Sequence, residues 1–223
     1  MGKPRQLKRR HHTVPQFHLE RFSNDREQVV RVALPGNKRD LVAIRDASVE
    51  KDFYLIESED GTRSDELENR LGEIEGAAAG AVRALVDDCV WPIPERARWD
   101  VAAWVASQAL RTTARRQAGS EIADMIFKLK VGAGGKPQIR RDLLKVHGRE
   151  PTVEEVDALW QTASDFDSYS VRVHPHFHLQ TMIDLMPGTT CMFHERGWTL
   201  IYFQRKMLVT GDNPVVLMPA KDS

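Results

Sequence analysis

The sequence predicts an α+β fold, with a mainly helical centre and short antiparallel strands near both ends. Helices are indicated because apolar residues recur at steps of three and four over residues 64–90 and 95–130, the period of a helix with one buried face. Strands are indicated by β-branched segments outside this centre. They lie at 28–34, 41–45, 198–203 and 207–218.

The chain of 223 residues is long enough to bury the core of one domain. We expect a single globular domain over residues 11–223, preceded by a flexible basic arm over residues 1–10. No apolar stretch approaches the ~20 residues that a membrane span needs, and none follows the basic N-terminus as in a secretory signal. The two cysteines, Cys89 and Cys191, form no disulfide framework and no metal-ligand cluster. These features indicate a reduced, cytoplasmic protein.

The first elements of the chain follow from local patterns. Thr13 and Gln16 have the spacing of a capping box, which predicts a short helix beginning there. The segments 28–34 and 41–45 flank a turn sequence and predict a hairpin. Residues 52–56 predict a further extended piece, which ends at a turn at Asp60-Gly61.

Two long helices form the predicted centre. Ser64 can cap the first, and Cys89 falls on its apolar stripe, where a cysteine usually behaves as a buried hydrophobe. The second runs over 95–130, with an interruption expected near Gly119. The first helix also carries a stripe of glycines four residues apart, Gly72, Gly76 and Gly80. Because glycine lowers helix propensity, this stripe suggests that another backbone approaches closely, within the chain or across a dimer.

The second half of the chain begins with a flexible break at the glycine-rich residues 132–135. Thr152 and Glu155 then form a second capping box, which predicts a helix to about Ala163. Residues 169–179 alternate between apolar and polar side chains like a strand, and helical spacing follows from Leu179.

Charge is segregated along a chain whose formal net charge is zero. Residues 46–90 carry thirteen acidic and four basic side chains, whereas residues 95–150 carry twelve basic and six acidic ones. Such segregation can create a local basic surface. The alternative, which we favour, is that the two consecutive segments pack together and neutralise each other.

Four motifs occur in order along most of the chain. They are the string His-His-Thr-Val-Pro-Gln-Phe-His-Leu-Glu-Arg-Phe at residues 11–22, Phe-Tyr at 53–54, Gln-Ala-Leu-Arg-Thr at 108–112 and Gly-Asp-Asn-Pro at 211–214. This order resembles the bacterial domain-of-unknown-function family four-two-three-eight. The last motif has Gly211 where the family pattern has serine. Members usually continue beyond it, so the resemblance implies a short or C-terminally truncated member, and it implies no reaction.

The paired histidines of the first motif, His11 and His12, are candidate catalytic residues. Adjacent histidines point in different directions, so the pair is unsuited to binding one metal, but either ring could act as a general acid or base. The alternative is a structural cluster in which the rings bond to distant carbonyls. His18 is interpreted as structural.

Gln108, Arg111 and Arg115 have spacings that place them on one helical face and make them candidate substrate-binding residues. An arginine can hold phosphate with two parallel hydrogen bonds. The alternative, which we favour, is an arginine paired with the acidic helix at 64–90. Asp212 and Asn213 are candidates for orienting a catalytic group and for binding substrate, although Asp-Asn-Pro is above all a turn sequence.

Two further patterns are weaker. An extended strand would place His174, His176 and His178 on one face, but we interpret them as an exposed polar edge and assign no metal residue. Residues 137–160 resemble a helix-turn-helix junction with basic side chains. No common nucleotide, hydrolase or metalloprotease motif is present. No cofactor is evident, and a divalent metal stays open.

Three functions remain. The first is a hydrolytic, nuclease-like enzyme that acts on a phosphodiester in nucleic acid or on another phosphate ligand, with His11 or His12 as general acid or base, Arg111 on the phosphate and Asp212 orienting. The second is a non-catalytic binding or assembly module in which the motif residues form a buried polar network, with homo-oligomerisation through a helix face. The third is a DNA-binding regulator that uses residues 137–160.

Overall fold

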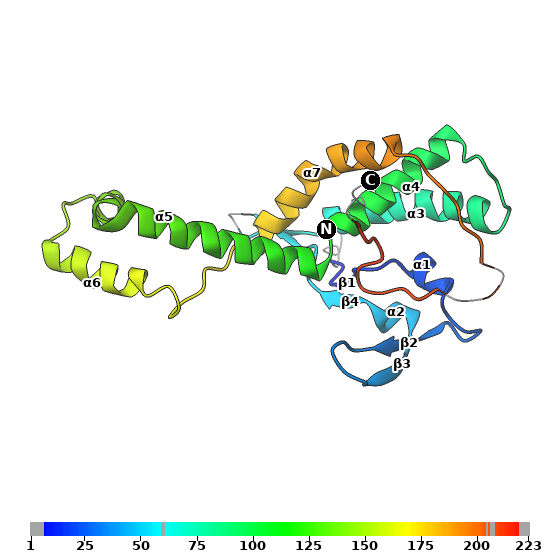
Figure 1. The fold of residues 1–223 in the computed structure, drawn as a ribbon, viewed down its shortest axis with the longest axis horizontal. Coiled ribbons are helices and arrows are strands. Elements are labelled where there is room, and N and C mark those ends of the chain that lie inside the picture. Colours follow the sequence, from blue (N-terminus) through cyan, green and yellow to red (C-terminus); the bar gives the residue numbers. More distant parts are fainter. Residues whose placement is uncertain (1–6, 59–60, 204, 206–207, 219–223) are drawn as a thin grey trace, which may run out of the picture. The chain divides into compact units, whose positions relative to one another are not determined.

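The chain is mostly helical with short paired antiparallel strands, which confirms the α+β class (Figure 1). The computed structural model describes residues 7–58, 61–203, 205 and 208–218. These residues form two compact units. Unit 1 contains the described residues up to Ala114 and from Leu179 onward, and unit 2 contains Arg115 to His178. Whether the two act as a single domain stays a prediction.

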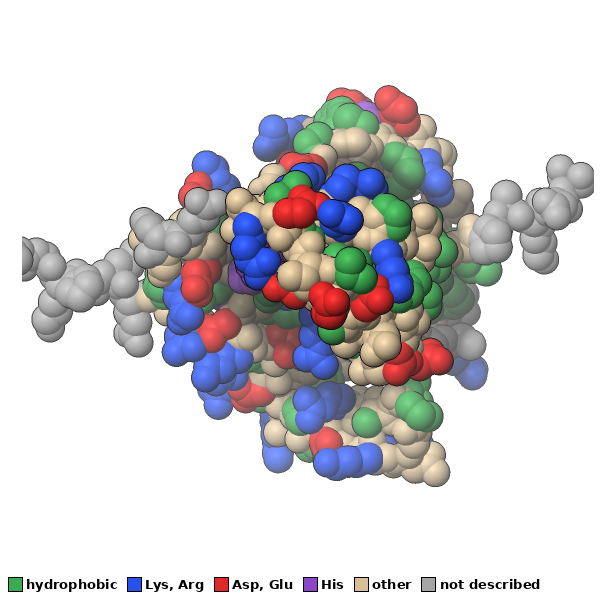
Figure 2. Space-filling view, turned by 90° about the vertical axis from the view of Figure 1, so that its left-hand side faces the viewer, with side chains coloured by type: hydrophobic (Ala, Val, Ile, Leu, Met, Phe, Trp, Pro, Cys, Tyr) green, Lys and Arg blue, Asp and Glu red, His purple; other side chains and the backbone are tan. Residues whose placement is uncertain are grey.

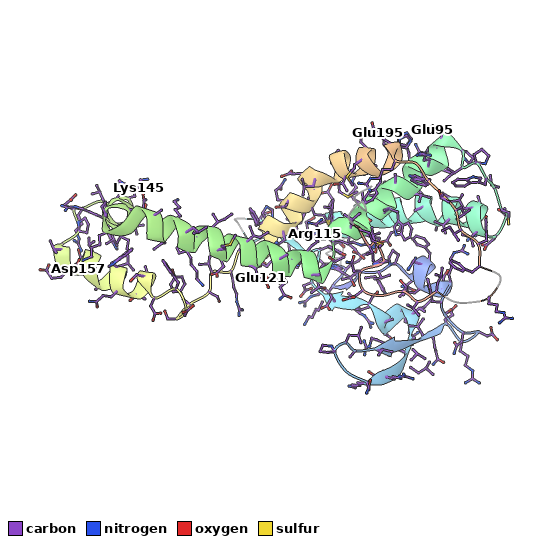
Figure 3. All side chains as sticks on the ribbon, in the orientation of Figure 1. Glu95, Arg115, Glu121, Lys145, Asp157 and Glu195 are labelled. Atoms are coloured by element: carbon purple, nitrogen blue, oxygen red, sulfur yellow. The ribbon has the colours of Figure 1, made fainter. Side chains whose placement is uncertain are left out.

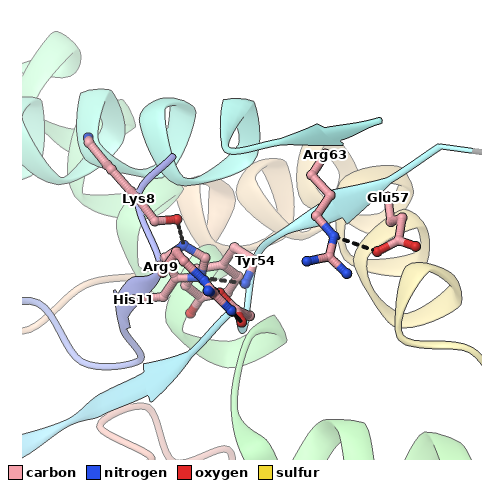
Figure 4. Close-up of polar contacts among 7 residues, drawn as sticks. Lys8, Arg9, His11, Tyr54, Glu57 and Arg63 are labelled. Carbon is pink, nitrogen blue, oxygen red and sulfur yellow. Dashed lines mark hydrogen bonds and ion pairs between the residues drawn. The ribbon is translucent and has the colours of Figure 1, made fainter. Parts of the chain in front are cut away.

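The strands of the described chain all lie in the N-terminal part of unit 1 and pair two by two. β1 (Arg10–His12) pairs with β4 (Val49–Lys51), and His11 lies opposite Glu50. The predicted hairpin is confirmed as β2 (Gln28–Val32) and β3 (Arg39–Ala43). The predicted extended piece at 52–56 is wrong for residues 52–54, which form a turn, and only Ile56 lies in a strand. That strand, β5 (Ile56–Glu57), pairs with β6 (Arg63–Ser64), and Arg63 donates to Glu57 over 2.8 Å (Figure 4). Asp60 lies outside the described residues.

His11 and His12 both lie in strand β1. The capping box predicted at Thr13 is wrong. Helix α1 (Gln16–Glu20) begins after Pro15, which supplies no side-chain cap. The extended chain continues past β1, so Thr13 donates both its backbone N–H, over 2.9 Å, and its hydroxyl, over 3.1 Å, to the carbonyl of Ser48. A small core under this segment packs α1 against α2 (Ile44–Ala47). Its buried members are Val14, Leu19 and Ile44.

The main core of unit 1 lies between α3 (Glu66–Val86) and α4 (Glu95–Leu110), which pack closely together. The buried side chains of the first cluster here are Ala78, Ala81, Leu85, Val101 and Trp104. Ser64 accepts a hydrogen bond from the Glu66 backbone N–H over 3.2 Å, so the predicted start of α3 is close to the observed one. The burial predicted for Cys89 is wrong, because α3 ends at Val86 and Cys89 is exposed with φ at 53°.

Two interruptions divide the helical segment that follows. The first falls at Arg111, which has φ −97° and ψ 7°, rather than near Gly119. The next helix, α5 (Thr113–His147), begins two residues later. The second interruption is Gly135, whose φ of 54° and ψ of −160° are not helical, so the predicted break at 132–135 is confirmed. Glycine adopts this backbone conformation readily, whereas it is costly for other residues.

Unit 2 is built around α5 and α6 (Val153–Ser164), and the second predicted capping box, Thr152 with Glu155, is confirmed. The chain between α6 and α7 returns along α5. Its backbone N–H at Val171 donates to Asp124 over 2.6 Å. Polar groups of α5 therefore hold this return segment in place.

Helix α7 (Pro175–Glu195) corrects the predicted strand at 169–179. Residues 169–174 form no strand, and the helix begins at Pro175, which is suited to a first helical turn because it lacks the N–H that such a turn leaves unpaired. From Leu179 onward α7 belongs to unit 1, where Leu179, Met182 and Phe193 are buried.

The predicted strands at 198–203 and 207–218 are wrong for their described residues, which form no strand. None of the described strands pairs with these residues, so this part of the chain contacts the helices of unit 1 instead. Trp198 and Val215 pack against the α4 core, and the Tyr202 hydroxyl donates to the Leu85 carbonyl over 2.8 Å. Met207 and residues 1–6 of the predicted arm lie outside the described residues. None of the described helices is long and apolar enough to cross a membrane.

Candidate functional site

A pocket in unit 1 joins the start of the paired-histidine motif to helix α3. Its volume is about 240 Å³. The lining side chains come from two segments, β1 to α1 and the part of α3 from Glu68 to Ala79. They are His12, Gln16 and Phe17 on one side and Glu68, Glu75, Gly76 and Ala79 on the other. The pocket thus combines an imidazole with two carboxyl groups, a set that is suited to proton transfer.

His12 is held in place by a backbone contact. Its Nε2 lies 3.1 Å from the carbonyl oxygen of Arg45. A carbonyl can only accept a hydrogen bond, so Nε2 of the neutral ring carries the proton and Nδ1 is the nitrogen that can take up another. The Gln16 amide lies beside the same ring, with 3.3 Å between the two nitrogens. Strand β1 and the Arg45 carbonyl therefore fix the His12 ring at the pocket.

Glu68 has an unusual proton affinity. Its pKa is raised to about 7, chiefly because burial disfavours the charged form and also because the Glu75 carboxylate repels it. The positive charges of Arg111 and Lys8 oppose this rise. At neutral pH the carboxyl group therefore populates both its protonated and its ionised form. A pocket carboxyl with this property is a candidate functional residue.

Arg111 is buried and does not line the pocket, but it contacts a carboxyl group that does. Its Nη1 forms an ion pair with Glu75 over 2.7 Å, and only 1% of the arginine side chain is exposed. With its amide oxygen turned toward the guanidinium, Gln108 accepts from Nε over 2.8 Å and also from Nη2. The predicted pairing of an arginine with the acidic helix is present. Arg111 therefore holds the Glu75 carboxylate in an ion pair, and Gln108 bonds to Arg111. Neither Arg111 nor Gln108 lines the pocket.

His11 is fully buried, and both of its ring nitrogens are used (Figure 4). The Tyr54 backbone N–H donates to Nδ1 over 2.7 Å, and Nε2 donates to the Lys8 carbonyl over 3.0 Å. The imidazole also stacks on the Tyr54 ring, with 5.4 Å between the centroids. This geometry holds one neutral tautomer and favours a structural role for His11.

The structure does not bring the other candidate residues to the pocket. Arg115 is the first residue of unit 2, and because the helix is interrupted at Arg111, the prediction of one shared helical face is wrong. Asp212 and Asn213 are exposed, and neither lines the pocket. His18 is interpreted as structural, since its Nε2 lies 2.9 Å from the Thr210 hydroxyl and burial lowers its pKa.

His174, His176 and His178 do not lie together on one strand. His174 precedes α7 and lies in no strand, whereas His176 and His178 lie on α7, so the three share no strand face. The described residues contain no group of three or more His, Cys, Asp or Glu side chains that could hold a metal ion.

Two of the four lysine and arginine side chains of residues 137–160 pair with acidic neighbours. Arg140 pairs with Glu150, and Arg149 pairs with Glu155. On the face drawn in Figure 2, basic and acidic side chains are interspersed. This pairing lowers the net positive charge that these residues present to a DNA backbone, and DNA binding stays a prediction.

Sequence reasoning missed Glu68 and Glu75, although a signal for them was present. The two are seven residues apart, so on a helix they share a face after two turns. The neighbouring glycine stripe also has a local explanation. A Cβ atom added to Gly72, Gly76 or Gly80 would meet no described atom within 4 Å, so the close backbone approach predicted within the chain is absent from the described residues. At Gly76 the missing side chain leaves room for the pocket.

The family model described as "Protein of unknown function (DUF4238)" matches residues 10–223. The chain therefore belongs to this family, as its motif order indicated. No curated protein and no solved structure matches the chain.

Proposed function

We propose that this domain is a hydrolytic enzyme that acts on a phosphodiester and that its acid–base pair is His12 and Glu68. The observation that carries the proposal is a carboxyl group with a pKa of about 7 in the pocket that a motif histidine also lines. A group that titrates near the working pH can both donate and accept a proton at low cost. This proposal gives His11 and Asp212 no catalytic role.

The two groups divide the proton transfers of hydrolysis. His12 removes a proton from water through Nδ1 while the water oxygen bonds to phosphorus. Protonated Glu68 gives its proton to the leaving oxygen as the phosphorus–oxygen bond breaks. The products are a phosphomonoester and an alcohol, and the pair is reset when His12 loses its proton and Glu68 regains one.

The charges around the pocket allow an anionic substrate to approach. Arg111 balances Glu75 within the ion pair, and Glu68 is neutral in its protonated form. Lys8 adds positive charge near Glu68, since it acts on the pKa of that carboxyl. Arg111 is thus a positioning residue that acts through Glu75 and does not itself hold the phosphate.

Hydrolysis of bis(4-nitrophenyl) phosphate and of single-stranded RNA and DNA oligonucleotides tests the proposal. We expect His12→Ala and Glu68→Gln each to lower kcat by about 100-fold or more while the proteins stay folded. Glu73→Gln, a matched change of an exposed carboxyl on the same helix, should leave kcat unchanged. Absence of hydrolysis with all three substrates, with and without Mg²⁺, would contradict the proposal.

The pKa of Glu68 also predicts how stability depends on pH. The folded protein binds this proton more tightly than the unfolded chain does, so the carboxyl lowers stability as pH rises from about 4.5 to about 7. Glu68→Gln should therefore stabilise the protein by about 1 kcal/mol at pH 8, a value reduced for partial solvent screening, and should have little effect at pH 4. Urea unfolding at both pH values measures the difference. An equal effect at both would exclude a raised pKa.

The pocket itself can be tested separately from its acid–base groups. Gly76→Leu should raise the free energy of unfolding by about 0.8 kcal/mol, because leucine has the higher helix propensity, and should block substrate by filling the pocket. Gly80→Leu is the matched control, since Gly80 is exposed on the same helix and does not line the pocket. It should bring the same stabilisation with full activity. Equal activity of the two variants would show that the pocket is not the active site.

A non-catalytic binding or assembly module is the second candidate function. The burial of three motif residues, His11, Gln108 and Arg111, supports this candidate, because each of them is enclosed with its polar partners. In that case His12→Ala should destabilise the fold as strongly as His11→Ala does. If His12→Ala leaves stability nearly unchanged and abolishes hydrolysis, the enzyme is supported.

A further inference from the structure

Lys8 is held at the start of helix α3 by its backbone alone. Its N–H donates to the Asp65 carboxylate over 3.1 Å, and its carbonyl accepts from the His11 ring over 3.0 Å. The next residue is also fixed, because the Arg9 carbonyl accepts from the Asp52 N–H over 2.8 Å. These contacts use no side-chain atom of Lys8. They therefore fix the residue and leave its ammonium group available.

The Lys8 side chain extends from this anchor toward the helix that carries the pocket carboxyl groups (Figure 4). Asp65 and Glu68 are three residues apart, which is about 4.5 Å along a helix axis. The flexible four-carbon stem of a lysine can span such a distance. Lys8 accordingly lies near enough for its positive charge to oppose the rise of the Glu68 pKa. Its ammonium group is thus close to the proposed general acid, although Lys8 does not line the pocket.

This ammonium group forms no ion pair within the part of the chain that the structure describes. The two basic residues that follow, Arg9 and Arg10, are each paired with an aspartate. In unit 2, Lys136 pairs with Asp157, which is labelled on α6 in Figure 3, over 2.8 Å. Lys8 differs from these side chains because its charge stays available to an anion.

We propose that Lys8 is the substrate-binding residue whose ammonium group donates to a non-bridging oxygen of the phosphodiester. The inference rests on the proposed function, and it supplies the phosphate contact that Arg111 does not make. The leaving oxygen and the non-bridging oxygens are bonded to the same phosphorus, so a cation beside Glu68 lies next to a non-bridging oxygen. Lysine binds phosphate as a point charge. The substrate class is thus an anionic ester, because an uncharged ester gains nothing from this contact.

The charges of the pocket agree with a substrate of one negative charge. A phosphodiester is a monoanion. Glu75 is already balanced by Arg111, and Glu68 is neutral in the protonated form that the proposed mechanism uses. The positive charge of Lys8 then has no counter-charge within the pocket, and the phosphodiester provides one.

Steady-state hydrolysis of bis(4-nitrophenyl) phosphate tests the contact. We expect Lys8→Met to raise KM about 10-fold and to leave kcat within about 2-fold, because substrate and transition state lose the same charge contact. Lys8→Arg keeps the charge and should keep KM close to the wild-type value. Lys51→Met, which changes an exposed lysine of strand β4, is the matched control and should alter neither constant. All three variants should unfold in urea like the wild type, since the backbone contacts of Lys8 remain.

The uncharged triester methyl bis(4-nitrophenyl) phosphate separates the charge of the substrate from its shape. It has the same leaving group but no negative charge, so Lys8→Met should leave its KM unchanged. Equal increases of KM for the diester and the triester would overturn the inference.

A binding measurement separates this inference from the hydrolytic function. Isothermal titration of the His12→Ala variant with bis(4-nitrophenyl) phosphate should give a dissociation constant that Lys8→Met raises about 10-fold. If the wild type binds the diester through Lys8 but does not hydrolyse it, the hydrolytic function is contradicted and the Lys8 contact stands. If Lys8→Met binds the diester as tightly as its parent, or if no variant binds it, the Lys8 contact is overturned, whether or not the wild type is active.

Discussion

Arg111→Met should lower the free energy of unfolding by about 3 kcal/mol, one of the two largest effects that we expect. The substitution leaves the Glu75 carboxylate without the guanidinium that lies 2.7 Å from it, and removing one partner of a buried ion pair typically costs 3–5 kcal/mol. We place the expected value at the lower end because the Glu75 side chain is 23% exposed. Gln108 also loses the donors that its amide oxygen faces. Equilibrium unfolding in urea measures the change.

The double variant Arg111→Met/Glu75→Leu separates the unpaired charge from lost packing. If the cost arises from the stranded carboxylate, the double variant should recover most of the lost stability, since an apolar pair of similar volume can replace a buried ion pair. A double variant that is less stable than Arg111→Met alone would contradict this account.

His11→Ala is the second large effect, with an expected loss of about 3 kcal/mol. The substitution removes a fully buried ring, leaves a cavity against Tyr54 and strands two backbone groups that the ring nitrogens satisfy. Thermal and urea unfolding should both show the loss. The variant should also be less active only in proportion to the fraction of unfolded protein.

His12→Ala is the matched control, because the neighbouring ring lies at the pocket and makes one contact with a backbone carbonyl. We expect a stability change below about 1 kcal/mol with loss of hydrolysis. The two adjacent histidines would then have opposite roles, one in the fold and one in the chemistry. Similar destabilisation by the two changes would favour the buried network over the enzyme.

The sequence predicted those elements whose signals are local. The helical period and the Thr152 capping box require only neighbouring residues, and both occur in the structure. The Thr13 capping box failed because the Thr13 backbone N–H, which the Gln16 side chain would have accepted, donates instead to the carbonyl of Ser48, a residue distant in the sequence. The C-terminal strands failed for a related reason: β-branched residues favour extended backbone, but a strand also needs a neighbour.

The candidate site was predicted only in part. His12 follows from the motif, and the pairing of Arg111 with the acidic helix follows from the need of a buried charge for a partner. The pKa of Glu68 could not be predicted, because it depends on burial and on charges from other elements. Which of two adjacent histidines is buried also depends on strand pairing, since β1 directs successive side chains to opposite sides.

The partial protonation of Glu68 means that the pocket has no fixed charge at neutral pH. An anion entering it draws a proton from the buffer onto the carboxyl, and a cation drives that proton out. Ligand binding is therefore coupled to proton uptake or release, and the measured heat of binding depends on the ionisation enthalpy of the buffer. A charged ligand in the pocket would therefore change the charge of Glu68 by up to one proton.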